Sequence, residues 1–187
     1  MSEPAKNQRY TYEDYRNFPD DLRCELIDGQ IYDMAPAPST NHQEIAGKIY
    51  HLARSFLESS GNNCRVFIAP VDVILAEDQV VQPDVFLVCD RSKIHERGLF
   101  GAPDVVFEIL SASTIKKDRT KKLDLYRRYG VLEYFLVDPD NEFIEKHEFL
   151  ESRSEQRVHT FEGEQTFTID TVGLEIVAKE LFPVGLP

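Results

Sequence analysis

Two long stretches of the chain have apolar residues at the spacing of an amphipathic helix. In residues 42–61 and again in residues 114–129, apolar positions recur every three or four residues, and Gly61 and Gly130 follow as stop signals. A shorter helix is predicted over residues 11–18. The pattern thus predicts two long helices and one short helix near the start.

Runs of β-branched and aromatic residues between these helices predict strands. They cover residues 64–75, 80–89, 104–110 and 133–139, and Asp28-Gly29 predicts a hairpin over residues 23–34. The order strand, helix, strand around the second long helix indicates a crossover between parallel strands. More polar runs follow from residue 142 onward. We therefore predict an α/β (α+β) fold with a central mixed β-sheet flanked by helices, an N-terminal β-hairpin and a C-terminal β-meander.

The length and the ends of the chain suggest one domain. At 187 residues we predict a disordered segment over residues 1–9 and a single domain over residues 10–187. The first residues lack the apolar core of a secretory signal, and no run approaches the ~18 apolar residues of a membrane span. The predicted location is the cytoplasm, without a membrane partner. Cys24, Cys64 and Cys89 are an odd count without the spacing of metal ligands, and two of them lie in apolar strand-like runs, so we expect reduced thiols.

The charge balance limits how the protein can bind nucleic acid. There are 33 acidic and 21 basic residues, a formal net charge of −12, which disfavours non-specific binding to phosphates. Residues 116–128 are an exception, with seven basic residues against two acidic ones. A solvated helix face is the simpler explanation for the outer lysines of this segment. A nuclease of this composition must concentrate its positive charge locally.

Glu108 interrupts an apolar strand. Because side chains alternate across a strand, Glu108 shares its face with Val106 and Leu110. A buried carboxylate is costly unless a cation or hydrogen-bond donors compensate it. If strand 80–89 lies alongside, Asp84 approaches Glu108, and the two acids together favour a divalent cation between them.

Lys122 lies on the apolar stripe of the following helix, together with Leu125 and Tyr126. Lysines normally occupy the solvated face of a helix, as Lys116, Lys117 and Lys121 can here. An ammonium group on the side that faces the sheet needs an anionic partner, and the two strand acids are the obvious candidates.

Each of these three residues has a simpler explanation when taken alone. Asp84 follows a proline and can form a turn or end a strand. Glu108 and Lys122 can form a structural ion pair, or Lys122 can extend to water at the helix edge. Their combination, an inward lysine on the helix directly after a strand with an inward glutamate, favours a functional site.

Six segments of the chain carry a family pattern: ELIDGQIYDMAP, NHQEI, APVDVIL, VQPDVFLV, GAPDVVFEILSAST and KKDRTKKLDLYRRYGVLEYFLVDP. Together, over about residues 10–182, they resemble the Uma-two family of restriction endonucleases. The resemblance implies the restriction-endonuclease-like fold of the PD-(D/E)XK superfamily. In that pattern two acids on neighbouring strands hold Mg²⁺, and a lysine assists the attacking water.

By this resemblance, Asp84 and Glu108 are the metal ligands together with the backbone carbonyl of Ile109, and the cation is Mg²⁺ with Mn²⁺ as an alternative. Leu110 stands where the superfamily pattern has its lysine. The resemblance implies that the lysine has moved to the helix, where Lys122 matches the family pattern.

Further candidates have accessory roles. Glu25, His42 and Gln43 match the family pattern, although a hairpin-edge glutamate and a core histidine are the simpler alternatives. Tyr126 lies one helical turn from Lys122 and either holds the lysine or touches the substrate.

The predicted function is metal-dependent hydrolysis of phosphodiester bonds in DNA by an endonuclease, and the resemblance implies a homodimer. One alternative is a catalytically weak or inactive nuclease-fold module that acts as a binding or scaffold protein for a nucleic-acid-processing partner, which the net negative charge favours. A serine hydrolase that uses ILSAST is disfavoured because the chain lacks a G-x-S-x-G motif, and the histidine spacing excludes an H-E-x-x-H zinc site.

Overall fold

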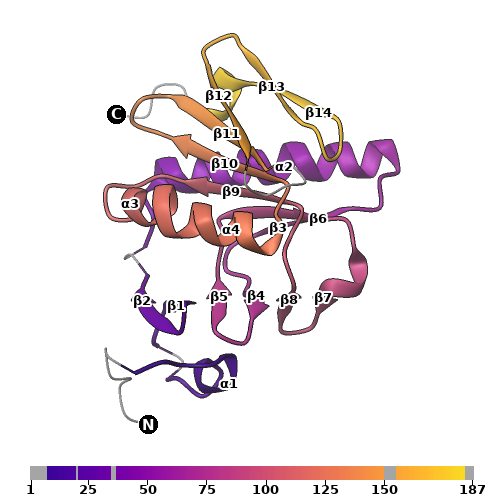
Figure 1. The fold of residues 1–187 in the computed structure, drawn as a ribbon. Helices are drawn as coiled ribbons and strands as arrows, with labels where there is room; N and C mark the ends of the chain where they lie inside the picture. The colour runs from indigo at the N-terminus through magenta and orange to yellow at the C-terminus, as the bar shows by residue number, and fades with distance from the viewer. Residues whose placement is uncertain (1–7, 20, 35–36, 150–154, 184–187) are drawn as a thin grey trace.

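The computed structural model describes residues 8–19, 21–34, 37–149 and 155–183, and it has two large β-sheets (Figure 1). The predicted α+β class is confirmed. Residues 1–7, most of the segment predicted to be disordered, lie outside the described residues, whereas Arg9 forms an ion pair with Asp78. None of the helices in the described ranges combines the length and the hydropathy of a membrane span.

The central sheet has the strand order β12-β11-β10-β9-β6-β3. Its strands are β3 (Arg65–Ile68), β6 (Val85–Val88), β9 (Val105–Ile109), β10 (Glu133–Asp138), β11 (Phe143–Phe149) and β12 (Gln156–Glu162). β9 and β10 run parallel, with Glu108 opposite Leu136, and the other neighbours are antiparallel. The predicted crossover and the mixed character of this sheet are therefore present.

A second sheet, with the order β2-β1-β5-β4-β8-β7, lies below the central sheet in Figure 1. It contains β1 (Cys24–Ile27), β2 (Gln30–Asp33), β4 (Val73–Ala76), β5 (Gln79–Val81), β7 (Ile94–His95) and β8 (Gly98–Phe100). The predicted N-terminal hairpin supplies β1 and β2, but it is part of a larger sheet.

The second sheet arises because two apolar runs are divided. The sequence predicts one strand in each of the runs 64–75 and 80–89, but each run forms two strands in different sheets. The breaks fall at Pro70 and Pro83, because proline has no N–H group to donate to a strand ladder. Asp84 therefore stands where the chain crosses from the second sheet to the central sheet.

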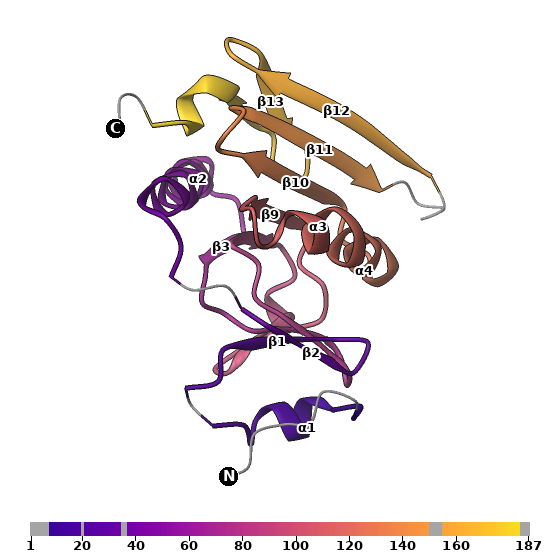
Figure 2. The ribbon, with the colours of Figure 1, turned by 90° about the vertical axis from the view of Figure 1, so that its left-hand side faces the viewer.

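Helices cover both faces of the central sheet (Figure 2). α2 (Thr40–Ser60) packs on one face together with the small sheet of β13 (Thr166–Ile169) and β14 (Leu174–Val177). α4 (Leu123–Tyr129) and residues of the second sheet pack on the opposite face. Shorter elements include α1 (Tyr12–Tyr15) and the 3₁₀ helices η1 (Arg91–Lys93) and η3 (Ala178–Leu181).

The helix predicted over residues 114–129 consists of three parts. α3 (Ile115–Lys117) and α4 flank a π-helical turn, η2 (Asp118–Lys122). Backbone hydrogen bonds in a π-helix span five residues rather than four, so the turn is wider, and such turns are frequent at functional sites. In this chain the turn buries both Asp118 and Lys122.

The cysteines differ from the prediction. We expect three reduced thiols from the sequence, but Cys64 and Cys89 form a disulfide with their Sγ atoms 1.96 Å apart, while Cys24 is free and buried. Arg65 of β3 lies opposite Val88 of β6 in an antiparallel pair. Cys64, directly before Arg65, therefore lies opposite Cys89, directly after Val88. An odd cysteine count concealed this cross-strand pair.

Replacement by alanine is expected to change the free energy of unfolding in opposite directions at Gly98 and Gly47. At Gly98, φ is +138° and an added Cβ would lie 2.4 Å from the carbonyl oxygen of Asp72, so Gly98→Ala should lower the free energy of unfolding by about 2 kcal/mol. At Gly47, within α2, an added Cβ meets no atom within 4 Å, so Gly47→Ala should raise it by about 1 kcal/mol. Urea unfolding of both variants checks the two signs, and a neutral Gly98→Ala would contradict the close backbone contact.

Candidate functional site

A cavity of about 770 Å³ opens where the chain crosses between the two large sheets. Its wall contains most of the predicted site residues: Glu25, His42, Gln43, Asp84, Glu108, Ile109 and Lys122. Tyr126 is fully buried and reaches this group through Glu108. The fold thus brings together residues from the hairpin, α2, the sheet crossing, β9 and the π-helical turn.

Asp84 faces the cavity from the crossing between β5 and β6. Its Oδ2 accepts a hydrogen bond from the backbone N–H of Ile109 at 2.7 Å and lies 3.2 Å from Nε2 of His42. The N–H and C=O groups of one strand residue point to the same edge, so the Ile109 carbonyl also lies on the Asp84 side of β9. The side chain of Asp84 remains 19% exposed. The structure therefore combines a reachable carboxylate with a backbone carbonyl.

The second Pro-Asp pair of the sequence has a different role. Asp104 Oδ2 accepts a hydrogen bond from the backbone N–H of Cys89 at 2.7 Å, and its own carbonyl accepts from Leu132 and Glu133. These bonds tie together the segments that lead into β9 and β10. Asp104 is thus a structural residue and a matched control for Asp84.

Glu108 lies in β9 on the face turned toward α4, as strand alternation predicts. Its Oε1 accepts hydrogen bonds from Lys122 Nζ at 2.8 Å and from the Tyr126 hydroxyl at 2.7 Å. Both bonds fall on one oxygen, which leaves Oε2 as the atom that can take a further ligand. Burial raises the pKa of the Glu108 carboxyl well above its ordinary value, although Lys122 opposes the shift.

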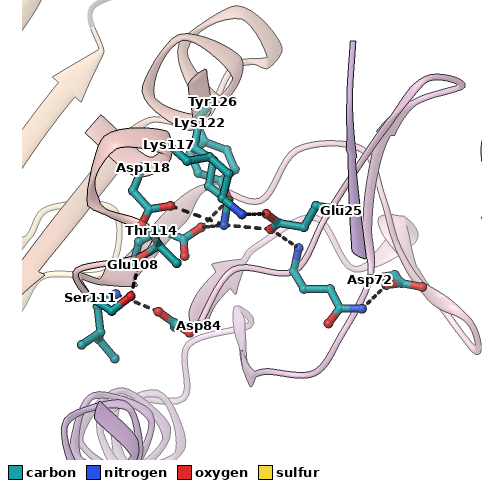
Figure 3. A network of polar contacts seen from close by, with 12 residues as sticks. Glu25, Asp72, Asp84, Glu108, Ser111, Thr114, Lys117, Asp118, Lys122 and Tyr126 are labelled. Carbon is teal, nitrogen blue, oxygen red and sulfur yellow. Dashed lines mark hydrogen bonds and ion pairs between the residues drawn. The ribbon is translucent and has the colours of Figure 1, made fainter. Parts of the chain in front are cut away.

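Lys122 is the centre of an ion cluster, with Glu25 and Glu108 reaching it from opposite sides (Figure 3). Its Nζ lies 2.8 Å from Glu108 Oε1, 2.8 Å from Glu25 Oε1 and 3.7 Å from Asp118 Oδ1. Burial alone would lower the pKa of this ammonium group, but the three carboxylates raise it well above its ordinary value. Lys122 therefore stays charged and is not a proton acceptor. Its side chain does not reach water at the helix edge, since it is only 4% exposed.

Glu25 is not at a hairpin edge, because β1 lies between β2 and β5. Its Oε1 accepts the backbone N–H of Gln82 at 3.1 Å, and its Oε2 lies 2.5 Å from Lys117 Nζ. Although burial opposes ionisation, Lys122 and Lys117 hold the pKa of Glu25 below its ordinary value. The solvated-face prediction for Lys117 is therefore wrong, since its ammonium group turns inward to a buried acid.

Asp118 joins the cluster although the sequence pattern did not single it out. It is 2% exposed, its Oδ1 has no hydrogen-bond partner among the described residues, and burial raises its pKa. At about 100° per residue, Asp118 lies about 40° from Lys122 on a helical wheel. The helical spacing that predicted an inward-facing Lys122 therefore also predicts an inward-facing Asp118.

His42 comes from the first turn of α2 and lines the cavity, so it is not a core histidine. Burial lowers the pKa of its imidazole, but the hydrogen bond and the charge of Asp84, together with Asp118 and the backbone of Ile109, raise the pKa above its ordinary value. Nδ1 has no hydrogen-bond partner among the described residues. Gln43 is exposed where α2 begins.

The cavity has an excess of acidic groups. Five carboxylates face one arginine, two lysines and one histidine in its wall: Glu25, Asp84, Glu108, Asp118 and Asp140 against Arg23, Lys117, Lys122 and His42. Within the described ranges, no three His, Cys, Asp or Glu side chains form a complete metal cage. Mg²⁺, however, usually takes only one or two carboxylates and keeps several waters. The oxygen donors of Asp84, Glu108 and Ile109 fit such a cation, which would also offset the excess negative charge.

Similar proteins include two relatives from Synechocystis and one solved structure from Anabaena variabilis. Two uncharacterized proteins from Synechocystis sp. (strain ATCC 27184 / PCC 6803 / Kazusa) are 28% identical over 121 residues and 31% identical over 114 residues, or 62% and 60% of this chain. These matches span 66% and 58% of the relatives, less than two thirds of their length. The crystal structure of a "putative nuclease belonging to DUF820" from Anabaena variabilis has the same fold, with a TM-score of 0.76 at 22% identity over 92% of this chain and 97% of that chain.

The family assignment rests on a longer match. The profile of the Uma2 family, described as "Putative restriction endonuclease", matches residues 10–183. This range contains every residue of the ion cluster and of the proposed cation site. Because the match covers most of the chain, the protein belongs to the Uma2 family.

Proposed function

We propose that the protein is a Mg²⁺-dependent endonuclease that hydrolyses phosphodiester bonds in DNA. The observation that carries this proposal is the convergence of Asp84, from the crossing between β5 and β6, and Glu108, from β9, in one cavity beside the buried charge of Lys122. Membership of the Uma2 family and the nuclease-like fold support a nucleic-acid substrate.

Asp84, Glu108 and the Ile109 carbonyl would hold the cation, with Mn²⁺ as an alternative. When bound, it would supply Lewis-acid polarisation of the scissile phosphate and a lowered pKa for a water nucleophile. The N–H of Ile109 and the imidazole of His42 contact Oδ2 of Asp84, which leaves Oδ1 of Asp84 as the oxygen that can bind the cation. In the same way, Lys122 and Tyr126 engage Oε1 of Glu108. The protein thus presents one oxygen of each carboxylate in a fixed orientation.

Lys122 contributes a fixed positive charge that acts on the reacting phosphate at a distance, since carboxylates enclose its ammonium group. A preorganised charge in a site with little water stabilises negative charge that develops in a transition state. Glu25 holds the two lysines in position, because its two oxygens contact Lys122 and Lys117 on the side of the cluster opposite Glu108. Glu25 is accordingly proposed as a positioning residue.

A binding or scaffold module is the second candidate function, and the net charge of −12 favours it. In such a module the ion cluster would serve only to join the two large sheets. The two candidates differ in one respect, which is divalent-dependent bond cleavage.

Incubation of supercoiled plasmid, linear duplex and single-stranded DNA with the purified protein separates the two candidates. We expect nicked and linear products from the supercoiled plasmid in Mg²⁺ or Mn²⁺, because an endonuclease needs no DNA end. We expect no products in EDTA, because EDTA removes the divalent cation. Unchanged DNA in every buffer would contradict the endonuclease proposal and favour the binding module.

The homodimer implied by the family resemblance is a separate proposal. A dimer would supply two active sites, one for each strand of a duplex. Light scattering on the purified protein should give the mass of two chains, and the mass of one chain would contradict the dimer.

A further inference from the structure

A second cavity, of about 380 Å³, adjoins the candidate site. The two cavities share Met34, Ser113, Thr114 and Lys117 in their walls. The second cavity continues between β2 and the helical segment α3–η2, where it reaches Tyr32, Lys116 and Lys121. A ligand that extends beyond the candidate site therefore has a continuous path across Lys117.

The second cavity is basic, in contrast to the protein as a whole. Its wall has three lysines, Lys116, Lys117 and Lys121, against one acid, Asp33. Arg127 and Arg128 of α4, by contrast, pair with Asp124 and line neither cavity. The positive charge that a protein of net charge −12 needs for binding phosphates is thus gathered next to the candidate site.

Two of these lysines are held in place by the second sheet. Lys121 Nζ donates a hydrogen bond to the Tyr32 hydroxyl of β2 at 2.6 Å. Lys117 Nζ lies 2.5 Å from Glu25 of β1 and has a 17% exposed side chain, against 4% for Lys122. Lys117 is therefore the lysine of the ion cluster that a substrate phosphate can reach, whereas Lys122 is enclosed by carboxylates.

We infer that the second cavity is a subsite for the DNA backbone, in which Lys116 and Lys121 bind phosphates that flank the scissile one and Lys117 meets the strand at the junction. This inference rests on the proposed function for the identity of the polymer. A phosphodiester backbone fits because it carries an unbroken row of charges, and lysines bind phosphates as point charges without regard to base sequence.

The test compares Lys116→Gln/Lys121→Gln with a control that removes the same charge elsewhere, Arg127→Gln/Lys179→Gln. Arg127 is half-buried and Lys179 is exposed, each pairs with one acid, and neither lines either of the two cavities. Fluorescence anisotropy of a labelled duplex, in EDTA and again in Ca²⁺ over a range of NaCl concentrations, measures the affinity. We expect the cavity variant to bind on the order of tenfold more weakly and to lower the slope of log K against log salt by about 1.8, because two phosphate contacts are lost. The control should follow the wild type.

Equal losses in both double variants would overturn the subsite, since the effect would then depend on net charge alone. Absence of duplex binding by the wild type in both buffers would also overturn it. If the cavity variant alone loses affinity, the subsite stands, even where the wild type fails to cut DNA in Mg²⁺ or Mn²⁺ and the endonuclease proposal fails. Conversely, cleavage by the wild type with unchanged affinity in the cavity variant would overturn the subsite and leave the endonuclease proposal in place.

Discussion

Replacement of Lys122 by methionine should destabilise the protein by about 3–5 kcal/mol at pH 7, because removing one partner of a buried ion pair leaves the other charge uncompensated. Lys122 Nζ contacts Glu108, Glu25 and Asp118, all of them buried, so three carboxylates lose their cation at once. Urea unfolding followed by circular dichroism gives the free energy of unfolding. Lys121→Met is the matched control, because its ammonium group is exposed and its change should stay within about 1 kcal/mol.

The loss in Lys122→Met should become smaller as the pH falls from 7 toward about 4. In the wild type, Lys122 and Lys117 hold the pKa of Glu25 below its unfolded value, so Glu25 contributes stability that is present above the unfolded pKa and lost as the pH falls through the folded one. In the variant, burial without Lys122 raises the carboxyl pKa values, and protonation then favours the folded state. A loss below about 1 kcal/mol, or one that does not change with pH, would contradict a buried ion cluster centred on Lys122.

Asp84→Asn should reduce metal-dependent DNA cleavage by roughly a factor of 10³ or more, since the loss of a carboxylate ligand removes several kcal/mol of transition-state stabilisation. Asparagine keeps an oxygen that can accept the Ile109 N–H, so the fold should be retained. Cleavage rates measured on a supercoiled plasmid under single-turnover conditions provide the comparison.

Asp104→Asn is the control for this second prediction. It removes the same charge from the same Pro-Asp context, but Asp104 binds the backbone of Cys89 and does not line the cavity. It should cleave DNA within a few-fold of the wild-type rate. Equal rates for Asp84→Asn and the wild type would show that Asp84 is not a ligand, and equal losses in both variants would point to a general effect of charge or folding.

The central part of the fold could be predicted because periodicity is a local signal. The alternation of side chains in β9 predicted that Glu108 shares a face with Val106 and Leu110, and helical spacing predicted that Lys122 points toward the sheet. The structure has both side chains in these orientations. The strand–helix–strand order predicted the parallel pairing of β9 and β10. Each of these inferences uses residues that are close together in the sequence.

The second sheet and the full cluster could not be predicted in the same way. Pro70 and Pro83 divide apolar runs between two sheets, and only the tertiary arrangement shows which partner each half takes. Glu25 meets Lys117 across 92 positions of sequence, a distance that no periodic pattern bridges. The π-helical turn also changes the phase of the helix, which is why Lys117 was assigned to the solvent.

The disulfide shows the same limit. Cysteine spacing indicates neither strand register nor which residues face each other, and Cys64 and Cys89 meet only because β3 pairs with β6. Long-range pairing therefore determined both the Glu25–Lys117 contact and the cysteine pair that sequence reasoning missed.

Isothermal titration of Mn²⁺ into the purified protein tests most directly whether Asp84 and Glu108 form a cation site. We predict binding of about one Mn²⁺ per chain in the wild type and in Asp104→Asn, and loss of that binding in Asp84→Asn and Glu108→Gln, because one or two carboxylates dominate such a site. No binding by the wild type, or unchanged binding by Asp84→Asn, would contradict the proposed metal-dependent site.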